Sequence, residues 1–357
     1  MYLKEVDPER HRRLAENARK LGNFVHNLTM LLEDGLSDDQ ILPIYEILPH
    51  MQNIRSLKII HNREDVTLHS ALHRVVGELS HLEHLTIEEN GFDPGFSRLP
   101  HPYVQVTQTF FHQFLHAVLS THGSRLKSLH LYTLLPLHRD LYITLRDDTP
   151  KLRQVSFAGN IDDTLENEFE EPIPWSSGKT GSLECLVLLN CTLHSSYFAR
   201  NVLCGVYGAR LKEVKVIACG SGRSGKFYIP LSSPPLRSGS IEHLQADHMT
   251  AWEIDVLSHI PTRELSLTRL RDKNFRRLPA LLREKVLHSD GTQSGFPGLD
   301  RLRLHPSIAD DGAWERFPDD CKVSYQELTE KCLPERGINL SLDAVVWPDA
   351  CYVHPHI

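Results

Sequence analysis

The sequence predicts an α/β solenoid, an arc in which short parallel strands form a concave sheet and helices cover the convex side. Three observations support this fold class: an aliphatic pattern that recurs along the chain, a polar residue at a fixed position after it, and helical spacing of apolar residues between the copies. The recurrence is the most informative of the three, because a chain that repeats one unit along its length folds as a repeat array.

The recurring pattern, called here the aliphatic phrase, is an aliphatic residue, two variable residues, a second aliphatic, one variable residue and a third aliphatic. The middle aliphatic of each copy stands at Leu57, Leu85, Leu129, Val155, Leu186, Val214, Leu244, Leu265 and Leu302. Successive copies are 28, 44, 26, 31, 28, 30, 21 and 37 residues apart, and the longer steps indicate insertions. A degenerate earlier copy is expected at Val25, Leu28 and Met30.

A second signal lies three residues after the third aliphatic, in five of the first six copies: Asn62, Asn90, Asn160, Cys191 and Cys219. A buried amide or thiol at such a turn can bond the backbone of neighbouring coils, so that few buried polar groups stay unpaired. The two signals together resemble the leucine-rich repeats, whose usual period is about 20 to 29 residues. The resemblance covers roughly residues 22 to 305 and is to the long, helix-bearing kind found in ribonuclease inhibitor and F-box proteins.

Between the predicted strands the apolar spacing changes to three or four residues, as a helix requires. Ser37 and Gln40 form a capping box that opens a predicted helix ending near Leu48. Further helices are expected from Pro8 to about Lys20 and near 104–121, and where apolar residues fall on one helical face: Phe111, Leu115 and Val118; Tyr197, Val202 and Val206; Phe275, Leu278, Leu281, Leu282 and Val286.

The expected organisation is an N-terminal helical cap at 1–21, a leucine-rich-repeat solenoid at 22–307, and a C-terminal cap and tail at 308–357. A solenoid grows without splitting, so the length of 357 residues does not indicate several domains. Stretches rich in Gly, Pro, Ser or acidic residues are expected to leave individual repeats as surface loops: Gly91 to Pro102, Asp162 to Glu171, Gly220 to Gly239 and Ser289 to Gly298.

The net charge of −7 gives no basic excess for binding nucleic acid or an anionic membrane. A local exception runs from Arg263 to Arg303, where ten Lys or Arg face five Asp or Glu. The chain has no N-terminal apolar segment after a basic stretch and no run of about 18 apolar residues. With seven cysteines, an odd number, we expect reduced thiols and a cytoplasmic or nuclear location.

The motifs that could carry chemistry are weak. The stretch from Gly220 to Lys226 has the spacing of a phosphate-binding loop, but Phe227 stands where such a loop needs Ser or Thr. Two histidine pairs at helical spacing, His69 with His73 and His112 with His116, lack further metal ligands in sequence. No G-x-S-x-G or Cys-x-x-Cys motif occurs. The sequence therefore predicts no catalytic residues, no metal and no cofactor, and a protein that is not an enzyme.

The residues between the buried aliphatics are expected to point toward the concave surface, because side chains alternate along a strand. Val187 and Leu189 with neighbouring Ala158 and Ile217 would form an apolar patch if they face solvent, or would be covered by helices or by the loop at 220–239. The residues expected to contact a partner are Tyr132, Ala158, Val187, Leu189, Lys215, Ile217, Gln245, Arg301 and Arg303. Tyr and Arg are common at interface hot spots.

The expected function is non-catalytic recognition of a protein partner. The stretches VHNLTM and YQELTEKCLPERGINLSL add to the resemblance to the repeat region of fungal F-box proteins. In that family the repeats select a substrate, and the F-box docks on the adaptor of a cullin-type ubiquitin ligase. No stretch before Val25 matches an F-box, so ligase membership requires one upstream of this chain. The alternative is a stand-alone scaffold or inhibitor. Neither hypothesis involves nucleic acid or membrane.

Overall fold

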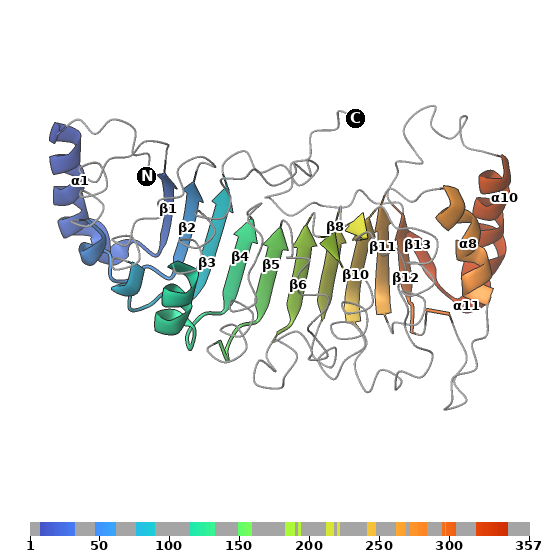
Figure 1. Cartoon of the computed structure of the whole chain (residues 1–357). Helices are drawn as coiled ribbons and strands as arrows, with labels where there is room; N and C mark the ends of the chain where they lie inside the picture. The colour runs from blue at the N-terminus through green and yellow to red at the C-terminus, as the bar shows by residue number, and fades with distance from the viewer. Residues whose placement is uncertain are drawn as a thin grey trace. The chain divides into compact units, whose positions relative to one another are not determined.

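The computed structural model describes residues 8–32, 47–61, 76–89, 114–132, 149–158, 183–189, 192–193, 212–217, 220–221, 241–247, 262–268, 272–283, 295–296, 298–304 and 319–341. The chain divides into two compact units. Unit 1 comprises Met1–Phe169 with Ser177–Leu183, and unit 2 comprises Glu170–Ser176 with Glu184–Ile357. In both units the strands run parallel to their neighbours (Figure 1).

In unit 1, parallel strands follow the order of the sequence. They are β1 (Asn27–Leu32), β2 (Ser56–His61), β3 (His84–Glu89), β4 (Ser128–Tyr132) and β5 (Gln154–Ala158). The middle aliphatics lie in register, because Leu57 pairs with Leu28 on one side and with Leu85 on the other, and Leu129 pairs with Leu85 and Val155. The aliphatic phrase therefore marks one strand per copy, as predicted.

The core of unit 1 is formed by the phrase and by the helical segment at 114–122. Leu57, Ile59, Leu85 and Leu129 are 0% exposed. Leu115 and Val118 are also 0% exposed, which confirms within 114–122 the apolar face predicted for this helix. Each fully buried aliphatic side chain contributes roughly 1.5 to 3 kcal/mol. Repetition of the phrase thus supplies most of the apolar burial that holds neighbouring coils together.

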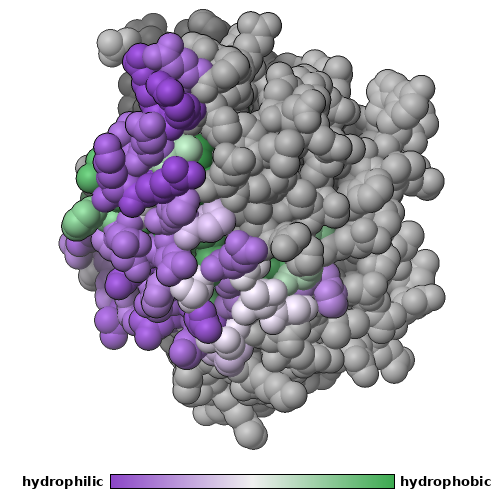
Figure 2. Space-filling model, turned by 90° about the vertical axis from the view of Figure 1, so that its left-hand side faces the viewer, coloured by the Kyte–Doolittle hydropathy of each residue, from purple (hydrophilic) through white to green (hydrophobic). Residues whose placement is uncertain are grey.

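The N-terminal helix α1 (Pro8–Leu21) lies where a charged helix was predicted. Its Ala15 and Ala18 pack with Ile47, next to the short 3₁₀ turns η1 (Gly22–Phe24) and η2 (Leu48–His50). Figure 2 shows that the described surface at this end is mostly hydrophilic, with small hydrophobic areas.

In unit 2 the strand order is β6 (Cys185–Leu189), β8 (Glu213–Ile217), β10 (Ile241–Asp247), β11 (Thr262–Thr268), β12 (Arg301–Leu304) and β13 (Asn339–Ser341), all parallel. Leu186, Val214, Leu244, Leu265 and Leu302 again lie in register. A separate pair joins β7 (Thr192–Leu193) to β9 (Gly220–Ser221). Strand β13 lies in the predicted C-terminal cap, where the sequence predicted no strand.

Helix α8 (Asp272–Arg283) confirms the prediction near Leu278, and Leu278, Leu281 and Leu282 are 1%, 2% and 4% exposed. After β12 the chain forms α10 (Asp319–Glu327), the π-helical turn η7 (Leu328–Cys332) and α11 (Leu333–Arg336). Gly337 caps α11 in the left-handed conformation, with φ of 67°. None of the helices within the described ranges is both long and apolar enough to cross a membrane.

One arginine ties the last helix of unit 2 to the segment before β12. Arg336 donates to the carbonyl oxygens of Leu282 (3.2 Å), Gly295 (2.6 Å) and Phe296 (3.1 Å). Phe296 has a φ of 55°, which is uncommon for a residue other than glycine. The guanidinium group therefore satisfies several backbone acceptors at a strained turn.

Several predictions lie outside the described residues. These are the Asn and Cys turn positions Asn62, Asn90, Asn160, Cys191 and Cys219, the capping box at Ser37, and the helix near Val202.

Candidate functional site

The strands of unit 2 turn a set of polar side chains away from the aliphatic core. Because side chains alternate and the strands are in register, these residues form two rows across the sheet. The first row is Glu213, His243, Glu264 and Arg301. The second row is Lys215, Gln245, Ser266 and Arg303. We call the two rows together the charged face.

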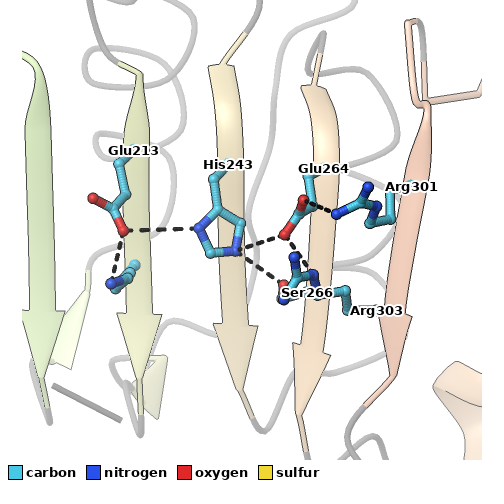
Figure 3. Close-up of polar contacts among 7 residues, drawn as sticks. Glu213, His243, Glu264, Ser266, Arg301 and Arg303 are labelled. Carbon is cyan, nitrogen blue, oxygen red and sulfur yellow. Dashed lines mark hydrogen bonds and ion pairs between the residues drawn. The ribbon is translucent and has the colours of Figure 1, made fainter. Parts of the chain in front are cut away.

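Two carboxylates of the charged face are held by cations. Lys215 Nζ lies 2.7 Å from Glu213 Oε1, on the same strand. Arg303 Nε lies 2.6 Å from Glu264 Oε1, and Arg301 Nη1 lies 3.4 Å from Glu264 Oε2. Figure 3 shows Arg301 and Arg303 converging from β12 on this one carboxylate of β11.

His243 lies between the two carboxylates (Figure 3). Its Nδ1 is 3.7 Å from Glu213 Oε1, and its Nε2 is 3.7 Å from Glu264 Oε1 and 3.0 Å from Ser266 Oγ. The contact with His243 and then that with Lys215 lower the pKa of Glu213 to about 2, although burial acts in the opposite direction. Glu213 is therefore a carboxylate at every physiological pH.

Cys185 on the neighbouring strand β6 donates its thiol hydrogen to Glu213 Oε2 over 3.5 Å. Burial, and then the negative charge of Glu213, raises the pKa of Cys185 to about 12. The thiolate is the reactive form of cysteine, so this thiol is a poor nucleophile near neutral pH.

Ser266, His243 and Glu213 follow one another as serine, histidine and carboxylate do in a hydrolytic triad. The Ser266 side chain is only 1% exposed, so a substrate has little access to its hydroxyl. The same kind of pair recurs in unit 1, where His84 and His130 bond the next strand's Ser128 and Ser156 at 2.7 and 2.8 Å. This recurrence favours a structural role, in which His–Ser hydrogen bonds link adjacent strands.

Gln245 is a residue of the charged face whose buried side-chain amide has an unsatisfied donor. Its side chain is 1% exposed, and its Nε2 has no hydrogen-bond partner in the described part of the chain. A buried donor without an acceptor costs about 1 to 3 kcal/mol, so such a group needs an explanation. Its strand neighbours in the second row are Lys215 and Ser266.

The structure brings together four of the residues expected to contact a partner, namely Lys215, Gln245, Arg301 and Arg303. In unit 1, Tyr132 is 7% exposed and stacks on His130 with ring centroids 6.1 Å apart. It is therefore packed and offers little surface to a partner.

Val187 and Leu189, the expected centre of an apolar patch, are not exposed to solvent. They are 5% and 0% exposed, so these two side chains do not face solvent. Ala158 and Ile217 occupy the corresponding ends of β5 and β8, and their side chains lie outside the description. Val187 and Leu189 therefore belong with the core residues in this structure.

A further charged set was missed from the sequence. The residue two positions before each middle aliphatic is charged in all nine copies: Arg55, Glu83, Lys127, Arg153, Glu184, Lys212, Glu242, Arg263 and Asp300. Lys127 Nζ lies 2.8 Å from Glu83 Oε2, and Lys212 Nζ lies 3.5 Å from Glu184 Oε2. Hydrogen bonding to Lys127 lowers the pKa of Glu83. The sequence signal for this set is a charged residue two positions before each middle aliphatic.

No group of three or more His, Cys, Asp or Glu suited to a metal ion occurs among the residues the structure describes. His69, His73 and His112 are outside those ranges, and His116 bonds Ser120 on its own helix at 3.5 Å. Of the glycine-rich stretch, Gly220 and Ser221 form β9 and the remainder is not described.

No family model matches this chain, and a search of curated proteins finds no match. The class of protein therefore follows from the fold alone: an α/β protein whose parallel strands repeat one aliphatic phrase.

Proposed function

We propose that this chain is a non-catalytic recognition protein that binds another protein on the strand face of a leucine-rich-repeat array. The observation that carries the proposal is the charged face of unit 2. Its long side chains are paired yet reachable: those of Arg301, Glu213 and Arg303 are 49%, 36% and 31% exposed. Paired charges on an open face act chiefly in orienting and selecting a partner.

The extent of the face suits a protein segment better than a small molecule. Its rows cross β8, β10, β11 and β12, which at about 4.8 Å per strand spacing is roughly 14 Å. Small-molecule sites are usually concave and mostly apolar with few polar groups. Here every position of both rows is polar, and arginine is a common anchor at protein interfaces.

We also propose that the repeated units are leucine-rich repeats. The aliphatic phrase and its in-register strands support repeats like those of ribonuclease inhibitor and F-box proteins. Substrate recognition for a cullin-type ubiquitin ligase is the leading form of the proposal. A stand-alone scaffold or inhibitor is the alternative, which the same strand face would serve.

The test is affinity purification with cross-linking and mass spectrometry, using the full chain as bait. The double variant Arg301→Glu, Arg303→Glu reverses the charge at β12. The matched control Arg19→Glu, Lys20→Glu changes two exposed basic residues of α1 in unit 1.

We expect a partner that cross-links near β12 with the wild type and the control, and that is lost with the double variant. Partners that are the same for all three baits would overturn the proposal. Recovery of the ligase adaptor in the same complexes supports the ubiquitin-ligase form. The adaptor binds an F-box, so this arm also requires the genomic sequence upstream of Met1. A face-dependent partner together with no in-frame F-box upstream supports the scaffold or inhibitor.

A further inference from the structure

We propose that the β12 end of the charged face is a receptor for a carboxylate side chain in an extended acidic segment of the partner protein. This inference rests on the proposed function and specifies the chemistry that the partner must present. Three features of the charged face carry it: a shared carboxylate, an excess of cations and an unpaired amide.

The shared carboxylate is that of Glu264. Arg303 Nε and Arg301 Nη1 approach its two oxygens at 2.6 and 3.4 Å. A guanidinium group has five N–H donors, and each arginine has this single ionic partner within the described residues. Most donors of the pair are therefore left for another acceptor, and a second carboxylate matches the planar fork of arginine.

The charge balance favours an incoming anion. Both rows together hold three cations (Lys215, Arg301 and Arg303) and two carboxylates (Glu213 and Glu264), a net +1 with His243 neutral. Lys215 Nζ forms an ion pair with Glu213 Oε1 at 2.7 Å, so these two charges cancel and the excess positive charge lies at β12. The net charge of the face is therefore opposite in sign to that of the whole chain, which is −7.

Glu264 acts as an internal competitor for the same guanidinium groups. An incoming carboxylate displaces it from the arginines, and Glu264 then still has His243 Nε2 at 3.7 Å and need not lose every polar neighbour. Neutralising Glu264 should therefore strengthen binding of an acidic segment. A purely structural role of Arg301 and Arg303 would not produce that effect.

The position of Gln245 indicates in which direction the acidic segment of the partner crosses the strands. Its unpaired Nε2 is in the second row on β10, two strands from Arg303, which is roughly 10 Å. An extended peptide advances about 3.3 Å per residue, so an acceptor three residues from the bound carboxylate reaches this amide. Gln245 is 1% exposed, so that acceptor has to insert between the long side chains of the face.

The experiment measures fluorescence anisotropy of labelled synthetic peptides with the full chain. One peptide carries Glu at every third position of a Gly-Ser sequence. The second has Gln at those positions, and the third has phosphoserine. We expect the Glu peptide to bind at least about tenfold more tightly than the Gln peptide, because the charge-assisted hydrogen bonds are lost with Gln.

The variants test the named residues. Arg301→Gln with Arg303→Gln should weaken binding of the Glu peptide by about tenfold or more, whereas Arg19→Gln with Lys20→Gln should not change it. Glu264→Gln should tighten it severalfold. If the double variant unfolds, Arg301→Gln alone serves, because its side chain is 49% exposed.

Equal binding of the Glu and Gln peptides would overturn this inference, as would tight binding of the phosphoserine peptide alone. Weaker or unchanged binding by Glu264→Gln would also overturn it. This outcome is separate from that of the cross-linking experiment. If a partner depends on the charged face but the chain does not prefer the Glu peptide, the proposed function stands and the proposal of an acidic segment is rejected.

Discussion

Protonation of one histidine in unit 1 should destabilise the fold in mild acid. His130 on β4 bonds Ser156 Oγ through Nδ1 at 2.8 Å and stacks on Tyr132. Its register neighbours are Thr86 on β3 and Ser156 on β5, which carry no charge, and His84 lies nearby. Burial, and then the charge of His84, lowers the pKa of His130 from 6.5 to about 4.

The sign follows from linkage between protonation and folding. Above pH 6.5 the histidine is neutral in both states and contributes no pH dependence. Below that value the unfolded chain takes up the proton more readily, so stability falls as the pH drops from 6.5 toward about 4. This interval, at about 1.4 kcal/mol per pH unit, corresponds to a loss of about 3 kcal/mol.

The assay is urea unfolding at several pH values between 7.5 and 4, on the wild type, on His130→Gln and on His81→Gln, an exposed control. The Gln at position 130 keeps a polar group beside Ser156 but does not titrate. We expect His130→Gln to lose stability less steeply with falling pH than the other two. The His130 ring resonance, identified by its absence in that variant, should titrate near pH 4.

Parallel pH curves for the wild type and His130→Gln would refute this reasoning, as would a His130 resonance that titrates near pH 6.5. Either result would mean that the ring is not shielded from water in the way the structure has it.

Three further predictions concern packing and reactivity. Gly22→Ala should lower the urea midpoint of unit 1 markedly, because the added Cβ would lie 2.2 Å from the backbone oxygen of His50, whereas Gly77→Ala, with nothing within 4 Å, should not. Cys185 should resist iodoacetamide at pH 8 in the native protein and react in urea, because its pKa is raised to about 12; rapid native labelling would contradict this. Leu189→Glu should lower the melting temperature strongly, because the side chain is 0% exposed and a buried carboxylate is costly. An unchanged melting temperature would mean that Leu189 is exposed to solvent.

Much of the sheet could be predicted from the aliphatic phrase. Its middle residues, such as Leu57 and Leu265, fall in strands and in register because a parallel sheet needs one apolar side chain at the same depth in each coil. Strand β13 was missed, since the glycine Gly337 stands where the first aliphatic of the phrase would be. The charged residue two positions before each middle aliphatic is visible in the sequence, but it was not used in the prediction.

The candidate site could be predicted only in part. Lys215, Gln245, Arg301 and Arg303 were expected on one face, since alternation along a strand determines which residues point away from the core. Exposure was not predictable in this way. Leu189 is on the side of its strand that alternation turns away from the core, yet it is 0% exposed.

The sequence by itself determined the repeated strand, its aliphatic side and the identity of the residues on its other side, because all three depend on spacing within a few residues. Only the tertiary structure decided which of those residues meet. Arg301 reaches Glu264 across 37 residues of sequence, and His243 lies between carboxylates that are 51 residues apart, at positions 213 and 264. Such distances depend on how insertions of unequal length bring neighbouring coils into register, which the local spacing does not encode.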